Sequence, residues 1–143
     1  MFCGILNPMS ADLRRRGRLL IIDDDESTTQ TFAKILTLEG YEVVTARNAV
    51  VGLRELEVSQ PDAVIIDLRM PFINGLGVLY RLRAGERGHR TPVAVVTGDQ
   101  CIGDDVLAEL RGLGAEVRFK PLWFDELVDV ARTLVQAGRR DLH

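Results

Sequence analysis

The stretch Leu19-Leu20-Ile21-Ile22-Asp23-Asp24-Asp25-Glu26 decides the fold, because four apolar residues are followed directly by four acidic ones. A continuous apolar run of this length is typical of a strand that is buried on both faces of a parallel sheet. From Ser27 the apolar residues recur at helical spacing, and Gly40 ends that pattern. We therefore predict a buried strand followed by a helix.

The same alternation continues along the chain. We predict further strands at 41–45, 63–66, 93–96 and 116–119, and further helices at 48–59, 76–82, 104–113 and 124–136. Parallel strands need long crossover connections, and these are usually helices. Five strands alternating with five helices therefore predict a single α/β domain with a doubly wound parallel sheet covered on both faces.

Length and composition exclude several classes of protein. The chain has 143 residues, 46% apolar and 27% charged, which suits one globular domain and argues against a disordered chain or a fibrous repeat. The formal net charge of −3 offers no general electrostatic reason to bind nucleic acid or an anionic membrane. Any charged ligand must therefore be recognised locally.

The terminal segments and the cysteines bear on location. Cys3 and Cys101 form neither a disulfide framework nor a CxxC motif, which favours a reducing compartment. The segment 1–9 is too short for the apolar core of a signal peptide, and Met9 is an alternative start. We expect a cytoplasmic protein with a flexible N-terminal tail at 1–17, a folded domain at 18–138 and a C-terminal tail at 139–143.

Residues with charged or hydroxyl side chains follow four of the five predicted strands. These are Asp23 and Asp24 after the first strand, Asp67 after the third, Thr97 after the fourth and Lys120 after the fifth. The carboxyl ends of parallel strands meet at one edge of the sheet, so we expect these side chains to lie close together. Neighbouring carboxylates repel one another unless a cation neutralises them, and their hard oxygen atoms suit Mg²⁺. A carboxylate beside this ion can attack phosphorus and form an acyl phosphate, while lysine and threonine bind the phosphoryl oxygens.

Each of these residues also has an ordinary structural interpretation. Asp25 and Glu26 suit the start of a helix, where the dipole favours negative charge. Asp67 and Thr97 are common turn residues, and Lys120 before a proline is typical of a solvated surface. The shared position at the ends of four strands favours a common site.

Together these residues resemble the receiver domain of two-component response regulators. The resemblance covers residues 18–137 and implies a flavodoxin-like sheet with strand order 2-1-3-4-5. It rests on segments that occur in the family's order and near its spacing, namely Leu19-Leu20-Ile21-Ile22-Asp23-Asp24-Asp25-Glu26, Val64-Ile65-Ile66-Asp67-Leu68-Arg69-Met70-Pro71, Asn74-Gly75, Val95-Val96-Thr97-Gly98 and Phe119-Lys120-Pro121.

The resemblance also implies a role for each residue at the strand ends. Asp67 is the implied phosphoacceptor. Mg²⁺ is implied to bind Asp24, Asp67 and the backbone carbonyl of Arg69 directly and Asp23 mostly through water, while Thr97 and Lys120 contact the phosphoryl oxygens.

Two further features concern the lifetime and the transmission of the signal. Arg69 and Asp99 occupy positions that flank the path of the hydrolytic water in the family, and we predict that they pair and slow dephosphorylation. Receivers commonly carry an aromatic residue three positions before the lysine, where this chain has Val117. We therefore expect the signal to pass through loop and helix shifts between Thr97 and Leu113.

The resemblance implies a signalling switch rather than a metabolic enzyme, with only self-catalysed phosphoryl transfer and slow autodephosphorylation. The donor would be a histidine kinase or a histidine phosphotransfer protein. Too few residues follow the last predicted helix for a DNA-binding helix-turn-helix domain, so we expect output by protein contact with an effector. The face formed by 104–113, 116–119 and 124–136 is the implied surface for a partner or a homodimer.

Two alternatives remain open. Asp23-Asp24-Asp25 also fits the Asp-x-Asp motif of haloacid-dehalogenase-type phosphatases with Asp23 as nucleophile, although that family places its lysine before a later acidic motif, whereas Lys120 follows Gly103-Asp104-Asp105. The other alternative is a receiver-like binding module that acts without phosphate, which Val117 favours and the complete set of strand-end residues opposes.

Overall fold

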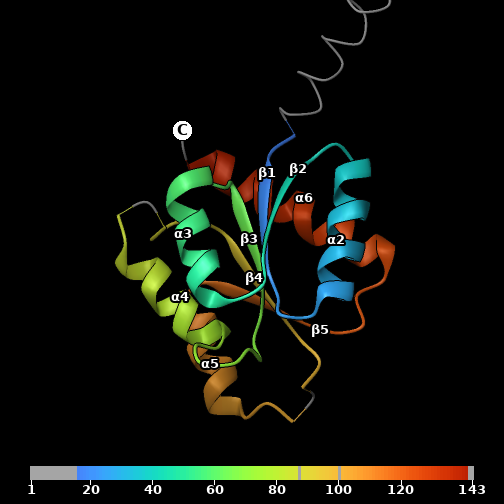
Figure 1. Ribbon diagram of the computed structural model, residues 1–143. Helices are drawn as coiled ribbons and strands as arrows, with labels where there is room; N and C mark the ends of the chain where they lie inside the picture. Colours follow the sequence, from blue (N-terminus) through green and yellow to red (C-terminus); the bar gives the residue numbers. More distant parts are fainter. Residues whose placement is uncertain (1–15, 87, 100, 142–143) are drawn as a thin grey trace, which may run out of the picture.

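The structure is a computed structural model and describes residues 16–86, 88–99 and 101–141. Within these residues the strands form one parallel sheet of order β2-β1-β3-β4-β5, as predicted (Figure 1). The elements, in chain order, are β1 (Arg18–Ile22), α2 (Glu26–Leu38), β2 (Glu42–Ala46), α3 (Ala49–Ser59), β3 (Ala63–Asp67), α4 (Gly75–Ala84), β4 (Val93–Thr97), α5 (Asp104–Gly112), β5 (Ala115–Phe119) and α6 (Phe124–Asp141).

The sheet separates two hydrophobic cores. Helices α2 and α6 cover one face, and α3, α4 and α5 cover the other (Figure 1). Leu19 and Ile21 of β1 pack towards the first group of helices, and Leu20 and Ile22 pack towards the second. All residues of β3 and β4 are buried, which confirms that the apolar runs are central strands. Burial of each large aliphatic side chain contributes roughly 1.5–3 kcal/mol.

Side chains that accept hydrogen bonds set the starts of three helices. Asp25 Oδ1 accepts hydrogen bonds from the backbone N–H groups of Ser27 at 3.0 Å and Thr28 at 3.4 Å, so its structural interpretation as a helix cap is confirmed. Asn48 caps α3, and Asn74 caps α4. Polar residues that follow β1, β2 and β3 thus serve local helix formation.

Several strand and helix boundaries differ from the sequence prediction. Asp67 and Thr97 are the last residues of β3 and β4 rather than the residues after them, because parallel pairing continues to Asp67↔Val96 and Thr97↔Phe119. Strand β2 begins at Glu42, one position later than predicted, since the N–H of Tyr41 donates to Leu36 O at the end of α2. Helix α4 extends to Ala84 instead of ending at position 82.

Helix α6 also runs to Asp141, beyond the predicted end at Gln136. A Cβ atom at Gly138 would lie 2.9 Å from Asp62 O and 3.3 Å from the ring of Pro92, so this glycine permits close packing instead of ending the helix. The helix therefore occupies residues 139–141 of the predicted C-terminal tail. Residues 142–143, and all but 16–17 of the predicted N-terminal tail, lie outside the described residues.

Candidate functional site

An acidic cluster lies at the carboxyl edge of the sheet. Strands β1 and β3 pair with Ile22 opposite Ile66, so the residues that follow, Asp23 and Asp67, are neighbours. Carboxylate oxygens of Asp23, Asp24 and Asp67 lie within 4.8 Å of one another. Asp23 and Asp67 are buried, and Asp24 is exposed. The structure thus brings the three predicted metal-binding carboxylates together.

Lys120 supplies the positive charge of this cluster. Its Nζ atom lies 3.0 Å from Asp23 Oδ2 and 3.6 Å from Asp67 Oδ1. The backbone N–H of Lys120 donates to Thr97 O at 2.8 Å, which holds the end of β5 beside the end of β4. Burial lowers the pKa of Lys120, but its hydrogen bond to Asp23 and the charges of both aspartates raise the pKa above its ordinary value. The lysine is therefore charged at neutral pH.

Asp67 is electrostatically disfavoured as an anion. Burial and the negative charge of Asp23 raise the pKa of Asp67 to about 6, against the opposing effects of Lys120 and a hydrogen bond from the backbone of Arg69. One lysine therefore does not offset the burial and repulsion of the carboxylates. An additional cation at the cluster would relieve this repulsion.

The backbone around Asp23 is held by a residue that the sequence analysis missed. Asp23 Oδ1 accepts the N–H of Asp25 at 2.9 Å. The buried hydroxyl of Thr29 lies 3.2 Å from Asp23 O and 2.8 Å from Asp25 O, and it donates to these carbonyls. The only available signal was a threonine in the first turns of α2, which is too common to single out.

Gly75 is required by the backbone that carries Asp67. A Cβ atom at this position would lie 2.6 Å from Asp67 O and 3.0 Å from Leu68 Cα. The N–H of Gly75 also donates to Leu68 O at 2.9 Å. The start of α4 is thus pressed against the end of β3, and no larger residue fits without displacing the site. The sequence analysis quoted Gly75 in a motif without identifying this contact.

Thr97 is fully buried at the end of β4, next to the end of β3. Its Oγ1 atom accepts the backbone N–H of Asp99 at 3.0 Å, so the proton of the hydroxyl is left for a different acceptor. No hydrogen bond joins this hydroxyl to the side chain of Asp67 or Lys120 in the described part of the chain. The threonine therefore lies at the end of the strand between those that carry Asp67 and lead to Lys120.

Arg69 and Asp99 form an ion pair between the loops that follow β3 and β4. Arg69 Nε donates to Asp99 Oδ2 at 3.1 Å, and Nη2 of the same guanidinium also contacts this oxygen. Asp99 Oδ1 accepts the N–H of Cys101 at 2.9 Å. The hydrogen bond from Arg69, followed by that from Cys101, lowers the pKa of Asp99. The two loops are thus connected at the same edge as the acidic cluster.

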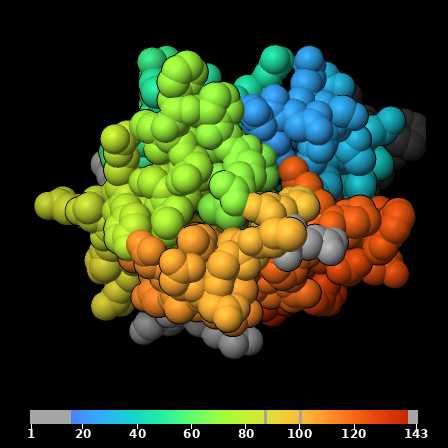
Figure 2. Space-filling model, turned by 90° about the horizontal axis from the view of Figure 1, so that it is seen from below, coloured from blue at the N-terminus to red at the C-terminus, as the bar shows by residue number. Residues whose placement is uncertain are grey.

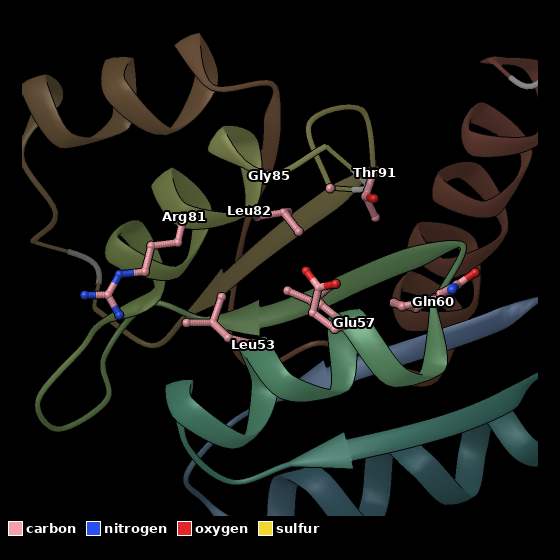
Figure 3. A pocket seen from close by; sticks show the side chains of 10 residues that line it. Leu53, Glu57, Gln60, Arg81, Leu82, Gly85 and Thr91 are labelled. Carbon is pink, nitrogen blue, oxygen red and sulfur yellow. The ribbon is translucent and has the colours of Figure 1, made fainter.

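The acidic cluster lies where several loops meet at the carboxyl edge of the sheet. Figure 2 shows this edge, where the start of α2, the loop after β3, the loop after β4 and the start of α6 meet. A cavity of about 670 Å³ lies elsewhere, between α3 and α4, bordered by Leu53, Glu57 and Leu82 among others (Figure 3). None of the predicted site residues lines it.

Among the described residues, no helix is both long enough and apolar enough to cross a membrane.

Comparison with known proteins gives a consistent result. The sequence model described as the response regulator receiver domain matches residues 19–132. The transcriptional regulatory protein PrrA of Mycobacterium tuberculosis is 32% identical over 119 residues, which are 83% of this chain and 50% of that protein. PcoR of Escherichia coli, also named a transcriptional regulatory protein, is 34% identical over 125 residues, with 85% and 53% covered. The chain thus spans about half the length of these curated relatives.

A solved structure supports the same assignment. The response regulator receiver domain protein from Clostridium thermocellum superposes with a TM-score of 0.76 at 27% identity, covering 87% of this chain and 97% of that one. Sequence and fold agree over nearly the same residues. The chain belongs to the family of response regulator receiver domains of two-component signal transduction systems.

Proposed function

We propose that the chain is a phosphorylation-dependent switch that accepts a phosphoryl group on Asp67 from a histidine kinase or a histidine phosphotransfer protein. The family is one of signalling modules and not of classical enzymes, so self-catalysed transfer and slow autodephosphorylation are its only chemistry. The observation that carries the proposal is the position of Lys120 Nζ, which contacts both Asp23 and Asp67 at the end of the sheet.

The transfer exchanges one bond to phosphorus for another. A carboxylate oxygen of Asp67 attacks the phosphorus of a phosphohistidine, an O–P bond forms, the P–N bond breaks and the imidazole leaves with the electron pair. With a pKa of about 6, Asp67 is mostly ionised at pH 7 and can act as the nucleophile. Lys120 then binds a phosphoryl oxygen, and Thr97 donates its free hydroxyl proton to another.

The acidic cluster fits Mg²⁺. Its carboxylate oxygens gather within 4.8 Å, and the repulsion among them favours a divalent cation. In the proposal Asp24, Asp67 and the backbone carbonyl of Arg69 hold the ion directly, and Asp23 holds it mostly through water. When bound, the ion supplies positive charge that stabilises the phosphoryl oxygens during transfer.

The Arg69–Asp99 pair is proposed to slow the loss of phosphate. Its partners come from the loops that follow β3 and β4, and the side chain of Arg69 is 65% exposed. A large guanidinium tied at this position would restrict the approach of water to an acyl phosphate on Asp67. The lifetime of the switch would then depend on one ion pair.

The route of the output follows from Val117. This residue pairs with Val95 and packs against the core beneath α4 and α5, where it offers no aromatic ring to rotate. We therefore assign the response to Thr97 and the segment through α5. The adjoining α5-β5-α6 face carries exposed aromatic side chains that suit contact with an effector protein or a second copy, namely Phe119, Trp123 and Phe124.

The approach of the donor is proposed to follow a groove beside the site. A cavity of about 400 Å³ lies between the start of α2 and the loop after β5 and includes Thr31, Phe32 and Lys120. A donor protein seated there would meet the lysine that contacts Asp67. Such a donor protein, output by contact with an effector protein, and a cytoplasmic location are parts of the proposal.

Intact-mass measurement tests the phosphoacceptor. We expect wild-type protein incubated with Mg²⁺ and acetyl phosphate to gain about 80 Da, the mass of one phosphoryl group. Asp67→Asn should gain nothing, and the exposed control Asp129→Asn on α6 should react as the wild type does. Size-exclusion of the beryllofluoride-bound protein would then report whether the switch changes its association state.

Two results would contradict the proposal. Wild-type protein that neither gains mass nor binds beryllofluoride would identify a binding module that acts without phosphate. Hydrolysis of phosphomonoesters that is lost in Asp23→Asn and retained in Asp67→Asn would identify a phosphatase that uses Asp23.

A further inference from the structure

A second group of charged residues lies at the opposite, amino-terminal edge of the sheet. A cavity of about 610 Å³ opens there between the loop preceding β4, the end of α5 and the last turns of α6. Among the described residues, the arginine and histidine side chains that line it are Arg83, His89 and Arg90, and no carboxylate of the described chain lines it. The residues at this cavity are distinct from those of the acidic cluster.

Arg83 carries a partly buried positive charge without a carboxylate partner in the described part of the chain. Its Nε donates to Leu113 O at 2.7 Å, and its Nη1 donates to Gly88 O at 3.0 Å and Thr91 O at 2.6 Å. These acceptors are all neutral carbonyl oxygens. Burial lowers the pKa of Arg83. A guanidinium in such surroundings gains more from an added anion than a fully hydrated one does.

The remaining side of this guanidinium borders the cavity. A Cβ atom at Gly114 would lie 3.6 Å from Arg83 Nη2, and one at Gly112 would meet nothing within 4 Å. Both glycines line the cavity, and a larger residue at position 114 would lie against the arginine. The donor group at Nη2 is therefore accessible to a ligand in the cavity.

His89 and Arg90 complete the wall from the loop before β4. His89 Nδ1 lies 3.2 Å from Glu86 O. The other ring nitrogen can form a hydrogen bond with an oxygen atom of a phosphate group. Arg90 is exposed and adds a second guanidinium.

We propose that this cavity binds a phosphate group, either free or carried by a small phosphate ester. Guanidinium groups present planar pairs of donors that match phosphate oxygens, and a neighbouring imidazole adds a further hydrogen-bonding group. The inference stands apart from the function proposed for Asp67, because none of its residues belongs to that site. It assigns anion binding to one edge of the sheet and cation binding to the other.

Backbone amide NMR during titration with inorganic phosphate tests the proposal. The titration is done in EDTA at constant ionic strength, so that no metal bridges phosphate to the acidic cluster. We expect saturable shifts centred on residues 88–92 and 112–114. Shifts centred on Thr97 and Lys120, or shifts that fail to saturate, would overturn the proposal.

Matched variants locate the binding further. Arg90→Ala and His89→Ala change exposed side chains and should fold normally, as a thermal melt can verify. Arg90→Ala should weaken phosphate binding about tenfold, the order expected for one charge-assisted hydrogen bond. Arg111→Ala removes the same charge from the exposed surface of α5 outside the cavity and should bind as the wild type does. An equal loss of phosphate affinity in Arg90→Ala and Arg111→Ala would show unspecific electrostatic attraction and refute the site.

A parallel titration with AMP distinguishes the two sources of phosphate. Tighter and saturable binding of AMP at the same amides would support an ester as the ligand, whereas equal affinities would support recognition of the phosphate group alone. Loss of AMP binding in Arg90→Ala is expected in both cases. If neither compound perturbs residues 88–92, the proposal fails.

Discussion

Charged groups that are partly or fully buried lie at both edges of the sheet, and they have opposite effects on stability. At the carboxyl edge, Asp23 and Asp67 are neighbours beside Asp24, and Lys120 does not fully offset their burial and repulsion. At the amino-terminal edge, the guanidinium of Arg83 on α4 donates to carbonyl oxygens of two other segments, the loop before β4 and the turn after α5. Charge therefore opposes folding at the first edge and links structural elements at the second.

The closest backbone contact at the carboxyl edge should give the largest effect. In Gly75→Ala the new methyl group meets Asp67 O, so we expect a loss of about 3 kcal/mol in the free energy of unfolding. Gly112→Ala is the matched control, because nothing lies near its added methyl group and alanine favours the helix. Urea denaturation of both variants measures the difference. Equal stability of the two variants would refute the close contact.

Removal of the charge of Asp67 should stabilise the metal-free protein. The folded pKa of about 6 lies above the ordinary value of 3.8, so protonation of Asp67 favours the folded state. This favourable contribution is complete below pH 3.8 and is lost as the pH rises through about 6. At pH 7 in EDTA we expect Asp67→Asn to be more stable than wild type by about 2–3 kcal/mol, an upper estimate.

The pH dependence of the added stability of Asp67→Asn is the critical observation. Denaturant unfolding between pH 4 and pH 8 should show the advantage of Asp67→Asn shrinking as the pH falls below 6. Asp129→Asn should show no such dependence, because Asp129 is exposed on α6. A destabilised Asp67→Asn at pH 7 would contradict the assignment of repulsion to this edge.

Removal of the charge of Arg83, at the amino-terminal edge, should destabilise the protein. In Arg83→Gln the carbonyl oxygens of Leu113, Gly88 and Thr91 lose their hydrogen bonds from this guanidinium, and we expect a loss of about 2 kcal/mol in the free energy of unfolding. The control is Arg81→Gln, which changes an exposed arginine of the same helix. Thermal or urea denaturation measures the difference in stability between these two variants. An unchanged Arg83→Gln would mean that this arginine does not connect the elements.

The exposed pair at the carboxyl edge should affect lifetime more than stability. Arg69→Ala should leave the free energy of unfolding nearly unchanged, since exposed ion pairs contribute little. If the pair restricts water, the variant should lose phosphate from Asp67 severalfold faster, as intact-mass measurements over time would show. Arg132→Ala breaks an exposed pair on α6 and should retain the wild-type lifetime. An unchanged lifetime in Arg69→Ala would exclude the proposed role.

Much of this architecture could be predicted because its signals are local. Apolar runs such as Leu19 to Ile22 specify buried strands, and the residues that end them are evident from the sequence. The end of α6 was missed because Gly138, read locally, weakens a helix, whereas in the fold it permits contact with Asp62 and Pro92. The contacts of Thr29 and Gly75 were missed for the same reason, since both depend on neighbouring backbone segments.

The sequence by itself determined the alternation of elements and the kinds of residue at the strand ends, because hydrophobic periodicity acts over a few residues. Only the tertiary structure decided how these residues meet. Lys120 reaches Asp23 across 97 positions of the chain, and the pKa of Asp67 rises only because parallel pairing buries it beside Asp23. Ionisation depends on burial and on distances between remote segments, and neither exists before the sheet has formed.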